Sequence, residues 1–290
     1  MTAAAPGDAR RCAVLGHPVG HSLSPLLHRT AYAVLGLDWT YDAHDVTPDG
    51  LAGFLDRLDP SWRGLSLTMP LKRAVLPLLD DLDDTGRAVG AVNTVLLDGA
   101  GRHGANTDVP GLVAALRAAG LSGPGGGRGV VVGGGATAAS ALAALVAVGV
   151  TEVQVRVREP ARADDTLRTG RRLGVAVRVA RLDEPWPGAA DVLVSTVPSP
   201  VAAALLPEAA LADGIVADVV YDPWPSPLLA RAARAGARTA SGIDLLVHQA
   251  VEQLRLMTGR AVDPAVLLAA ATAAVEQGGA GPGDGYPRGP

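Results

Sequence analysis

The chain contains one lysine, Lys72, beside 24 arginines. A guanidinium stays protonated in a protein, whereas an ammonium is a compact donor whose pKa can shift far enough to exchange a proton. Lys72 ends the segment LSLTMPLK (65–72), an apolar run interrupted by hydroxyls, which suits a half-buried site. We interpret it as a proton-transfer group rather than a surface lysine, and Asp108 is the carboxylate expected to pair with it.

Short polar segments elsewhere could hold a ligand. They contain Ser22, Ser24, Ser66, Thr68, Asn93, Asn106 and Thr107. Within each serine or threonine pair the two hydroxyls are two residues apart, on one side of an extended segment. Together these groups suit a small polyhydroxylated ligand. Structural roles are the alternative: Ser24 as a helix N-cap, the asparagines at turns, and Asp108 as the cap of the next helix.

A dinucleotide site is indicated by residues 130–142, which read as a buried strand, a glycine turn and an Ala-rich helix. The spacing Gly133-x-Gly135-x-x-Ala138 fits the dinucleotide fingerprint. Gly133 permits the tight turn, Gly135 lets the backbone approach a pyrophosphate, and Ala138 lets the helix pack on the strand. The expected cofactor residues are therefore Gly133, Gly134, Gly135, Ala136, Thr137 and Ala138. A flexible loop is the alternative.

The next expected strand ends at Val157, followed by Arg158, Glu159 and, after three residues, Arg162. An acidic residue there would take the ribose hydroxyls of NAD, whereas an arginine accommodates the 2′-phosphate of NADP. We favour NADP(H), held by Arg158 and Arg162, although Glu159 would repel that phosphate if it pointed inward. A solvated charged turn is the alternative.

Two α/β units should position these residues. Strands are predicted over 11–15, 39–46, 64–68, 92–97 and 101–105, with a hairpin at 98–99 and helices from Ser24 and over 51–58, 74–79 and 84–89. A helix over 109–118 and a Gly-rich stretch at 121–128 follow. Further strands are predicted over 130–132, 153–157, 175–179, 192–195 and 215–218. We expect a mostly parallel α/β substrate domain (1–110, completed by helices over 244–277), a Rossmann-like domain (111–243) and a disordered tail (278–290).

Composition narrows the functional classes. The net charge of −4 gives no basic footprint for nucleic acid, and Cys12 is the only cysteine, which fits a reducing compartment. The six histidines show no metal-ligand spacing, so no metal is expected. The uncharged stretch 129–151 is explained better by a strand, a turn and a helix than by a membrane span, and the start lacks a secretory signal. We expect a cytoplasmic protein without membrane or nucleic-acid partners, and consider a homodimer.

Four ordered motifs resemble those of the shikimate dehydrogenase family. They are GHPVGHSLSP (16–25), LTMPLK (67–72), GAVNT (90–94) and GANTD (104–108), and they precede the glycine loop. YDP (221–223) and LLVHQA (245–250) extend the similarity, which covers the chain from about residue 12 to residue 277.

This resemblance implies NADP-dependent reduction of 3-dehydroshikimate to shikimate, on the route to chorismate and aromatic amino acids. Carried over by position, the substrate residues are Ser22, Ser24, Ser66, Thr68, Asn93, Tyr221 and Gln249. Lys72 and Asp108 would be the catalytic pair, and Gly242 would join the cofactor residues.

The chain departs from the family pattern at three places. Many members have asparagine at Ser66, the cofactor strand usually ends Asn-Arg-Thr rather than Val157-Arg158-Glu159, and an Asn-containing stretch is more usual at 194–198. Quinate, or both acids, is an alternative substrate, although Ser24 favours shikimate over quinate. A non-catalytic relative that only binds these ligands is the other alternative.

Overall fold

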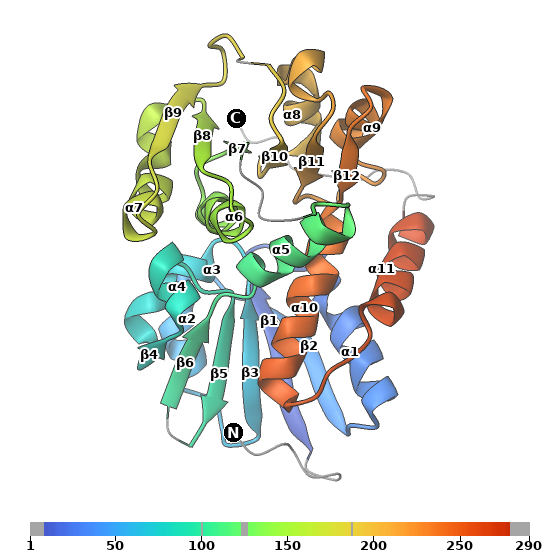
Figure 1. Ribbon diagram of the computed structural model, residues 1–290. Helices are drawn as coiled ribbons and strands as arrows, with labels where there is room; N and C mark the ends of the chain where they lie inside the picture. The colour runs from blue at the N-terminus through green and yellow to red at the C-terminus, as the bar shows by residue number, and fades with distance from the viewer. Residues whose placement is uncertain (1–8, 100, 123–126, 187, 279–290) are drawn as a thin grey trace.

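The computed structural model describes residues 9–99, 101–122, 127–186 and 188–278, which build two six-stranded sheets flanked by helices (Figure 1). The expected tail from residue 279 onward lies outside the described residues. No helix in the described part of the chain is long and apolar enough to cross a membrane.

The first sheet is mixed, with the strand order β2-β1-β3-β5-β6-β4. Its strands are β1 (Arg10–Gly16), β2 (Trp39–Asp45), β3 (Trp62–Leu67), β4 (Asp81–Leu82), β5 (Thr94–Asp98) and β6 (Gly101–Ala105). β1 pairs in parallel with β2 and β3, whereas β5 is antiparallel to both β3 and β6. The hairpin expected between residues 92 and 105 is thereby confirmed, and the two-residue edge strand β4 was not predicted.

Helices join these strands: α1 (Ser24–Leu35), α2 (Pro48–Leu55), α3 (Leu71–Ala74), the 3-10 turn η1 (Leu76–Leu78) and α4 (Asp84–Val89). The helix predicted over 74–79 is wrong, because α3 ends at Ala74 and Pro77 within the following turn has no amide to continue it. The N-cap role of Ser24 is also wrong. Leu23 is the N-cap, Ser24 is the first helical residue, and the Ser24 amide donates to the Ser22 hydroxyl at 3.3 Å.

The second sheet is entirely parallel, in the order β12-β11-β10-β7-β8-β9. Its strands are β7 (Arg128–Val132), β8 (Glu152–Val157), β9 (Val177–Arg181), β10 (Val192–Ser195), β11 (Ile215–Asp218) and β12 (Arg238–Ala240), of which β12 was not predicted. From β7 the chain first builds the sheet outward through β8 and β9, and then continues on the other side of β7 with β10. Open parallel sheets bind ligands at such a switch point, here between β7 and β10.

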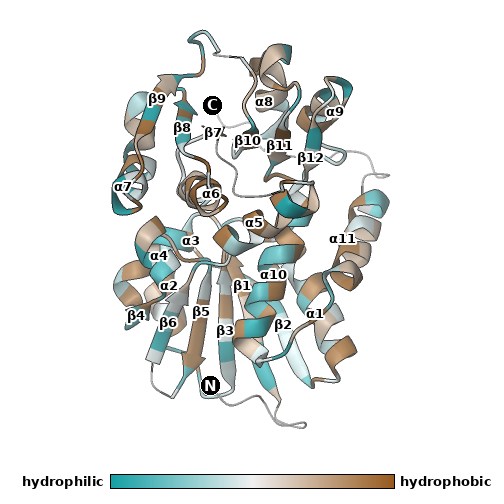
Figure 2. Cartoon of the chain, viewed as in Figure 1, coloured by the Kyte–Doolittle hydropathy of each residue, from teal (hydrophilic) through white to brown (hydrophobic). Residues whose placement is uncertain are grey.

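The helices of this sheet are α6 (Ala136–Ala147), η2 (Pro160–Ala163), α7 (Asp164–Arg172), α8 (Ser199–Leu205), η3 (Glu208–Ala210) and α9 (Pro227–Arg234). All residues of α6 from Ala138 to Leu145 are buried, and Figure 2 shows this helix as hydrophobic on most of its surface. The uncharged stretch 129–151 is therefore a strand, a glycine turn and a core helix, as predicted.

Two C-terminal helices return to the first sheet. α10 (Gly242–Thr258) starts at a capping box of Ser241 and Asp244. Its C-cap, Gly259, has a left-handed conformation that separates it from α11 (Pro264–Gly278). Residues of α10 share an apolar core with β1, α1 and β2. The C-terminal part of the chain therefore contributes side chains beside the first sheet.

The connecting helix α5 (Asp108–Ala118) crosses between the two sheets and packs against α10 and α6 (Figure 1). Gly111 permits this approach, since a Cβ there would lie only 2.8 Å from the backbone nitrogen of Gln249. The start of α5 and the middle of α10 are thus held against each other, next to the ends of β5 and β6.

Candidate active site

A pocket of about 180 Å³ opens between the first sheet and the elements of the second half. It is lined by all nine residues predicted to bind substrate or transfer protons: Ser22, Ser24, Ser66, Thr68, Lys72, Asn93, Asp108, Tyr221 and Gln249. Thr137 and Gly242, from the predicted cofactor set, also line it, together with Val14, Leu67, Val219, Leu245, Leu246 and Gln253. Residues from positions 14 to 253 therefore converge on one site.

Lys72 and Asp108 form an ion pair with a distance of 2.5 Å between Nζ and Oδ2. Their side chains are 15% and 8% exposed, so the pair is shielded yet reachable from the pocket. The carbonyl of Lys72 accepts a hydrogen bond from the Val92 amide at 2.8 Å, which ties α3 to the segment before β5. An ammonium held this way can exchange a proton with an oxygen in the pocket.

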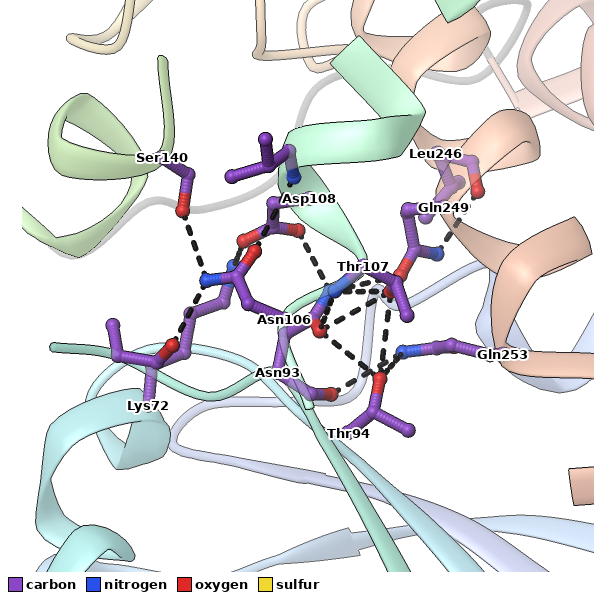
Figure 3. A network of polar contacts seen from close by, with 12 residues as sticks. Lys72, Asn93, Thr94, Asn106, Thr107, Asp108, Ser140, Leu246, Gln249 and Gln253 are labelled. Carbon is purple, nitrogen blue, oxygen red and sulfur yellow. Dashed lines mark hydrogen bonds and ion pairs between the residues drawn. The ribbon is translucent and has the colours of Figure 1, made fainter. Parts of the chain in front are cut away.

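Asp108 is the first residue of α5, where a helix favours a negative charge. It does not cap that helix, because Asn106 Oδ1 accepts the hydrogen bond from the Val109 amide at 3.2 Å. Asn106 also donates to the Ser140 hydroxyl on α6 at 3.1 Å, which links the polar segment to the second half of the chain (Figure 3). Both carboxylate oxygens of Asp108 therefore face residues of the site, Oδ2 toward Lys72 and Oδ1 toward Asn93.

Asn93 is the centre of the polar network in Figure 3. Its Nδ2 donates to Asp108 Oδ1 at 2.8 Å and to Gln249 Oε1 at 3.3 Å, while its Oδ1 accepts from the Thr107 amide at 2.8 Å. The Thr107 amide can only donate, so it fixes which end of the Asn93 side chain faces Asp108. Asn93 is thus an oriented hydrogen-bonding group and not merely a turn residue.

Gln249 and Tyr221 close the pocket from the C-terminal half. Gln249 donates from Nε2 to the Leu246 carbonyl of its own helix at 2.9 Å, which leaves its oxygen directed at Asn93. Tyr221 follows β11 and lies near the backbone of Leu23. Burial raises the pKa of the Tyr221 phenol, so it remains a neutral hydrogen-bonding group.

Besides apolar lining residues, two polar residues in or next to this site were not found from the sequence. Gln253 lies one helical turn after Gln249, and that i, i+4 spacing was the signal that could have revealed it. Tyr41, in β2, is fully buried and donates to the Ser66 hydroxyl at 2.6 Å. No local pattern marks Tyr41, because its partner is distant in sequence.

The glycine loop has the geometry expected of a dinucleotide turn. Gly133 has a φ of +117°, which favours glycine. A Cβ at Gly134 would lie 2.0 Å from the carbonyl oxygen of Arg162, so the middle glycine is required by close packing. At Gly135, the N-cap of α6, nothing lies within 4 Å of that position. The helix start is thus open, as a bound pyrophosphate requires.

Two more predicted cofactor residues are explained by packing. Ala138 is fully buried at the start of α6. A Cβ at Gly242 would lie 2.6 Å from the Val220 carbonyl carbon, so glycine lets α10 begin close to the chain that follows β11. In the segment 194–198, Thr196 donates to the Val132 carbonyl at 2.9 Å and thereby supports the strand before the glycine turn.

Arg158 and Arg162 lie outside the pocket, exposed beyond the end of β8. Neither has an ion pair within the described residues. Glu159 lies between them, and its carboxylate is 3.7 Å from Arg181 at the end of β9. Arg181 also binds Asp183 through Nε at 3.0 Å. Glu159 is therefore partly neutralised by an arginine that was not predicted, while two arginines are available to a phosphate.

No group of three or more side chains that could hold a metal ion occurs in the part of the chain that the structure describes. The donors in the pocket are hydroxyls, amides and one ion pair, a set suited to a polyhydroxylated acid. The exposed arginines and the open start of α6 suit a phosphorylated dinucleotide.

The family model of the shikimate dehydrogenase substrate binding domain matches residues 14–95, and that of the shikimate 5'-dehydrogenase C-terminal domain matches residues 242–272. The shikimate dehydrogenase (NADP(+)) of Rubrobacter xylanophilus is 39% identical over 274 residues, which is 90% of this chain and 94% of that protein. The chain belongs to the shikimate dehydrogenase family.

Solved structures of this family agree. The crystal structure of Mycobacterium tuberculosis shikimate dehydrogenase superposes with a TM-score of 0.81 at 36% identity and covers 91% of this chain and 99% of that one. A Thermus thermophilus shikimate 5-dehydrogenase in complex with NADP(H) and shikimate gives a TM-score of 0.79 at 36% identity, with 91% of this chain and 99% of that one covered. The predicted family and two-part α/β architecture are thereby confirmed.

Proposed function

We propose that this chain is an NADP-dependent shikimate dehydrogenase that interconverts 3-dehydroshikimate and shikimate, in the biosynthesis of chorismate and aromatic amino acids. The observation that carries the proposal is the Lys72–Asp108 pair, 2.5 Å apart, in a pocket otherwise lined by hydroxyls and amides. Relatives named shikimate dehydrogenase (NADP(+)), which match most of the chain, support it.

Lys72 is the proposed proton donor. NADPH, when bound, supplies a hydride to the carbonyl carbon of the substrate. The Lys72 ammonium then gives a proton to the oxygen of that carbon, and Asp108 stabilises the ammonium before transfer. Asn93 holds Asp108 in place through its 2.8 Å hydrogen bond. In the reverse direction, neutral Lys72 accepts the proton from the substrate hydroxyl.

The other pocket residues would orient the substrate. Ser22 and Ser24 lie at the start of α1, and we assign the substrate carboxylate to them. Thr68, Asn93, Tyr221 and Gln249 would contact the ring and its hydroxyls. Holding the reacting carbon in one position reduces the entropic cost of the reaction.

The cofactor would lie along the second half of the site. Residues 133–138 would hold its pyrophosphate at the start of α6, where Gly135 leaves space. Arg158 and Arg162 would bind the 2′-phosphate, and Thr137, in the first turn of α6, lines the pocket. Gly242 would shape the adjoining wall.

The chain is divided, in this proposal, into a substrate-binding part (1–110 with 244–277) and a cofactor-binding part (111–243). We also propose a cytoplasmic location, which the single buried Cys12 supports. A homodimer and the lack of nucleic-acid partners stay predictions.

Initial rates of nicotinamide reduction test the proposal, with shikimate or quinate as substrate and NADP⁺ or NAD⁺ as oxidant. We expect fast turnover with shikimate and NADP⁺, and much lower kcat/KM in the other three combinations. Folded protein that binds shikimate but reduces neither cofactor would instead indicate a non-catalytic relative. Equal rates with quinate would change the substrate assignment.

A further inference from the structure

A continuous chain of hydrogen bonds lies behind the pocket and joins β2 to the Asn93 network. Tyr41 donates to Ser66 Oγ at 2.6 Å, Ser66 donates to Gln253 Oε1 at 2.8 Å, and Gln253 Nε2 donates to the Asn93 carbonyl at 3.2 Å and to Thr94 Oγ1 at 3.1 Å. All five residues are at most 4% exposed. Three of the five also line the pocket: Ser66, Asn93 and Gln253.

The direction of this chain is fixed by one backbone group. The carbonyl of Asn93 can only accept, so the Gln253 atom facing it must be the amide nitrogen. The Gln253 oxygen therefore faces Ser66 and must accept the only hydroxyl proton of Ser66. Since that proton is used, Tyr41 must be the donor in its bond with Ser66.

This direction limits what Ser66 can offer to a ligand. A hydroxyl has one proton and two lone pairs. Ser66 donates its proton to Gln253, and one of its lone pairs accepts the proton of Tyr41, which leaves a single lone pair. Toward the pocket Ser66 can therefore accept one hydrogen bond but donate none. It can bind a ligand hydroxyl and cannot satisfy a ligand carbonyl or carboxylate oxygen.

We propose that Gln253 is a positioning residue that locks Ser66 as a hydrogen-bond acceptor toward the pocket, so that this point of the site selects a proton-donating hydroxyl of the substrate. Tyr41 occupies one lone pair of Ser66 and leaves the other for that hydroxyl. The inference rests on the proposed function, because it takes shikimate as the ligand. It assigns roles to two residues that do not react with the substrate themselves.

The surroundings of Tyr41 support this arrangement. The ring of His28 stacks on Tyr41 with centroids 3.9 Å apart, and this holds the phenol against β3. Burial raises the pKa of the Tyr41 phenol, so it retains its proton over the working pH range of an enzyme. A directional network of this kind is costly to leave partly unsatisfied in a buried site.

Binding of fluorinated ligands tests the proposal, because fluorine in place of a hydroxyl cannot donate a hydrogen bond. Dissociation constants are measured by calorimetry for shikimate and for analogues in which each ring hydroxyl is replaced in turn by fluorine. In the unmodified protein, we expect one analogue to bind at least about tenfold more weakly than shikimate. In Ser66→Ala this penalty should vanish, because shikimate itself loses the contact.

Two further variants separate positioning from general loosening. Gln253→Met releases the Ser66 proton, so Ser66 can turn it toward the ligand, and the penalty for that analogue should fall below about threefold. Tyr41→Phe leaves the Ser66 proton on Gln253, so the penalty should remain. Unfolding of each variant by heat, followed by circular dichroism, shows that it is folded.

Three results would distinguish the possible failures. If shikimate does not bind the unmodified protein, the proposed function fails. If shikimate binds and is oxidised, yet no analogue shows a penalty that depends on Ser66, this inference alone is wrong. A uniform loss for all ligands in Gln253→Met, with the penalty kept, would also refute it and leave Gln253 as a structural residue.

Discussion

His28 should make the protein sensitive to acid, although it takes no part in the reaction. The side chain is fully buried beneath the pocket, against Tyr41. Its Nδ1 faces the Ser24 carbonyl at 2.9 Å and must therefore carry the proton, while Nε2 has no hydrogen-bond partner among the described residues. A second proton on Nε2 would place an unpaired charge in the core. Burial accordingly lowers the pKa of His28 to about 4, against an ordinary value of 6.5.

Below pH 6.5 the unfolded chain protonates this histidine and the native chain does not, so stability falls as the pH drops toward 4. The full loss is about 3 kcal/mol, and about 2 kcal/mol of it should be gone at pH 5 relative to pH 8. His28 is a fully buried residue of α1, so an added proton destabilises the packing of this helix on the sheet.

This loss of stability at low pH can be measured by urea unfolding, followed by circular dichroism, at pH 8, 6 and 5. The unmodified protein is compared with His28→Gln. The variant should be less stable at pH 8 but should lose about 2 kcal/mol less between pH 8 and pH 5. His28→Phe, which keeps an aromatic ring against Tyr41, is a second non-titrating variant. If both variants lose stability in parallel with the unmodified protein, His28 is not the acid-sensitive group.

Other changes should have separate readouts. Arg181→Gln should leave Glu159 without its ion-pair partner and raise KM for NADP⁺ by up to about fivefold. In a Glu159→Gln background the same change should have no effect on KM. Equal effects in both backgrounds would show that the ion pair does not influence NADP⁺ binding. Gly134→Ala should lower the free energy of unfolding, measured by heat or urea, by about 1–3 kcal/mol, since its Cβ meets a backbone carbonyl at 2.0 Å. Gly135→Ala should fold normally and weaken NADP⁺ binding in calorimetry. Burial raises the pKa of Asp218, so its ionisation opposes folding; Asp218→Asn should gain stability relative to the unmodified protein as the pH rises above about 4, and a constant difference would contradict this.

Local sequence patterns predicted most of the fold. The glycine turn before α6 and the hairpin between β5 and β6 depend on neighbouring residues, so their signals are visible in short segments. The edge strands β4 and β12 have only two and three residues, which is too short for an alternating pattern. They exist because a neighbouring strand supplies their hydrogen bonds.

The candidate site was predictable where motif order marked it, and not where distant residues meet. Lys72 stands out by residue type, and Asp108 is the one carboxylate in the polar motifs that could pair with it. The contact between Tyr41 and Ser66 joins β2 to β3, and Gln253 reaches Ser66 from a helix 187 positions later in the chain. Likewise, Arg181 lies beside Glu159 because β8 and β9 are neighbours in the sheet. Such pairings follow from the assembled fold and leave no local pattern.

Turnover of shikimate with NADP⁺ by the unmodified protein and by Lys72→Met tests whether Lys72 transfers the proton. Methionine fills similar space but cannot transfer a proton. We predict that kcat falls at least about 100-fold, while the dissociation constants of shikimate and NADP⁺ change by no more than a few-fold and the variant remains folded. A folded Lys72→Met variant that retains more than about a tenth of the original kcat would contradict the assignment of Lys72 as the proton-transfer group.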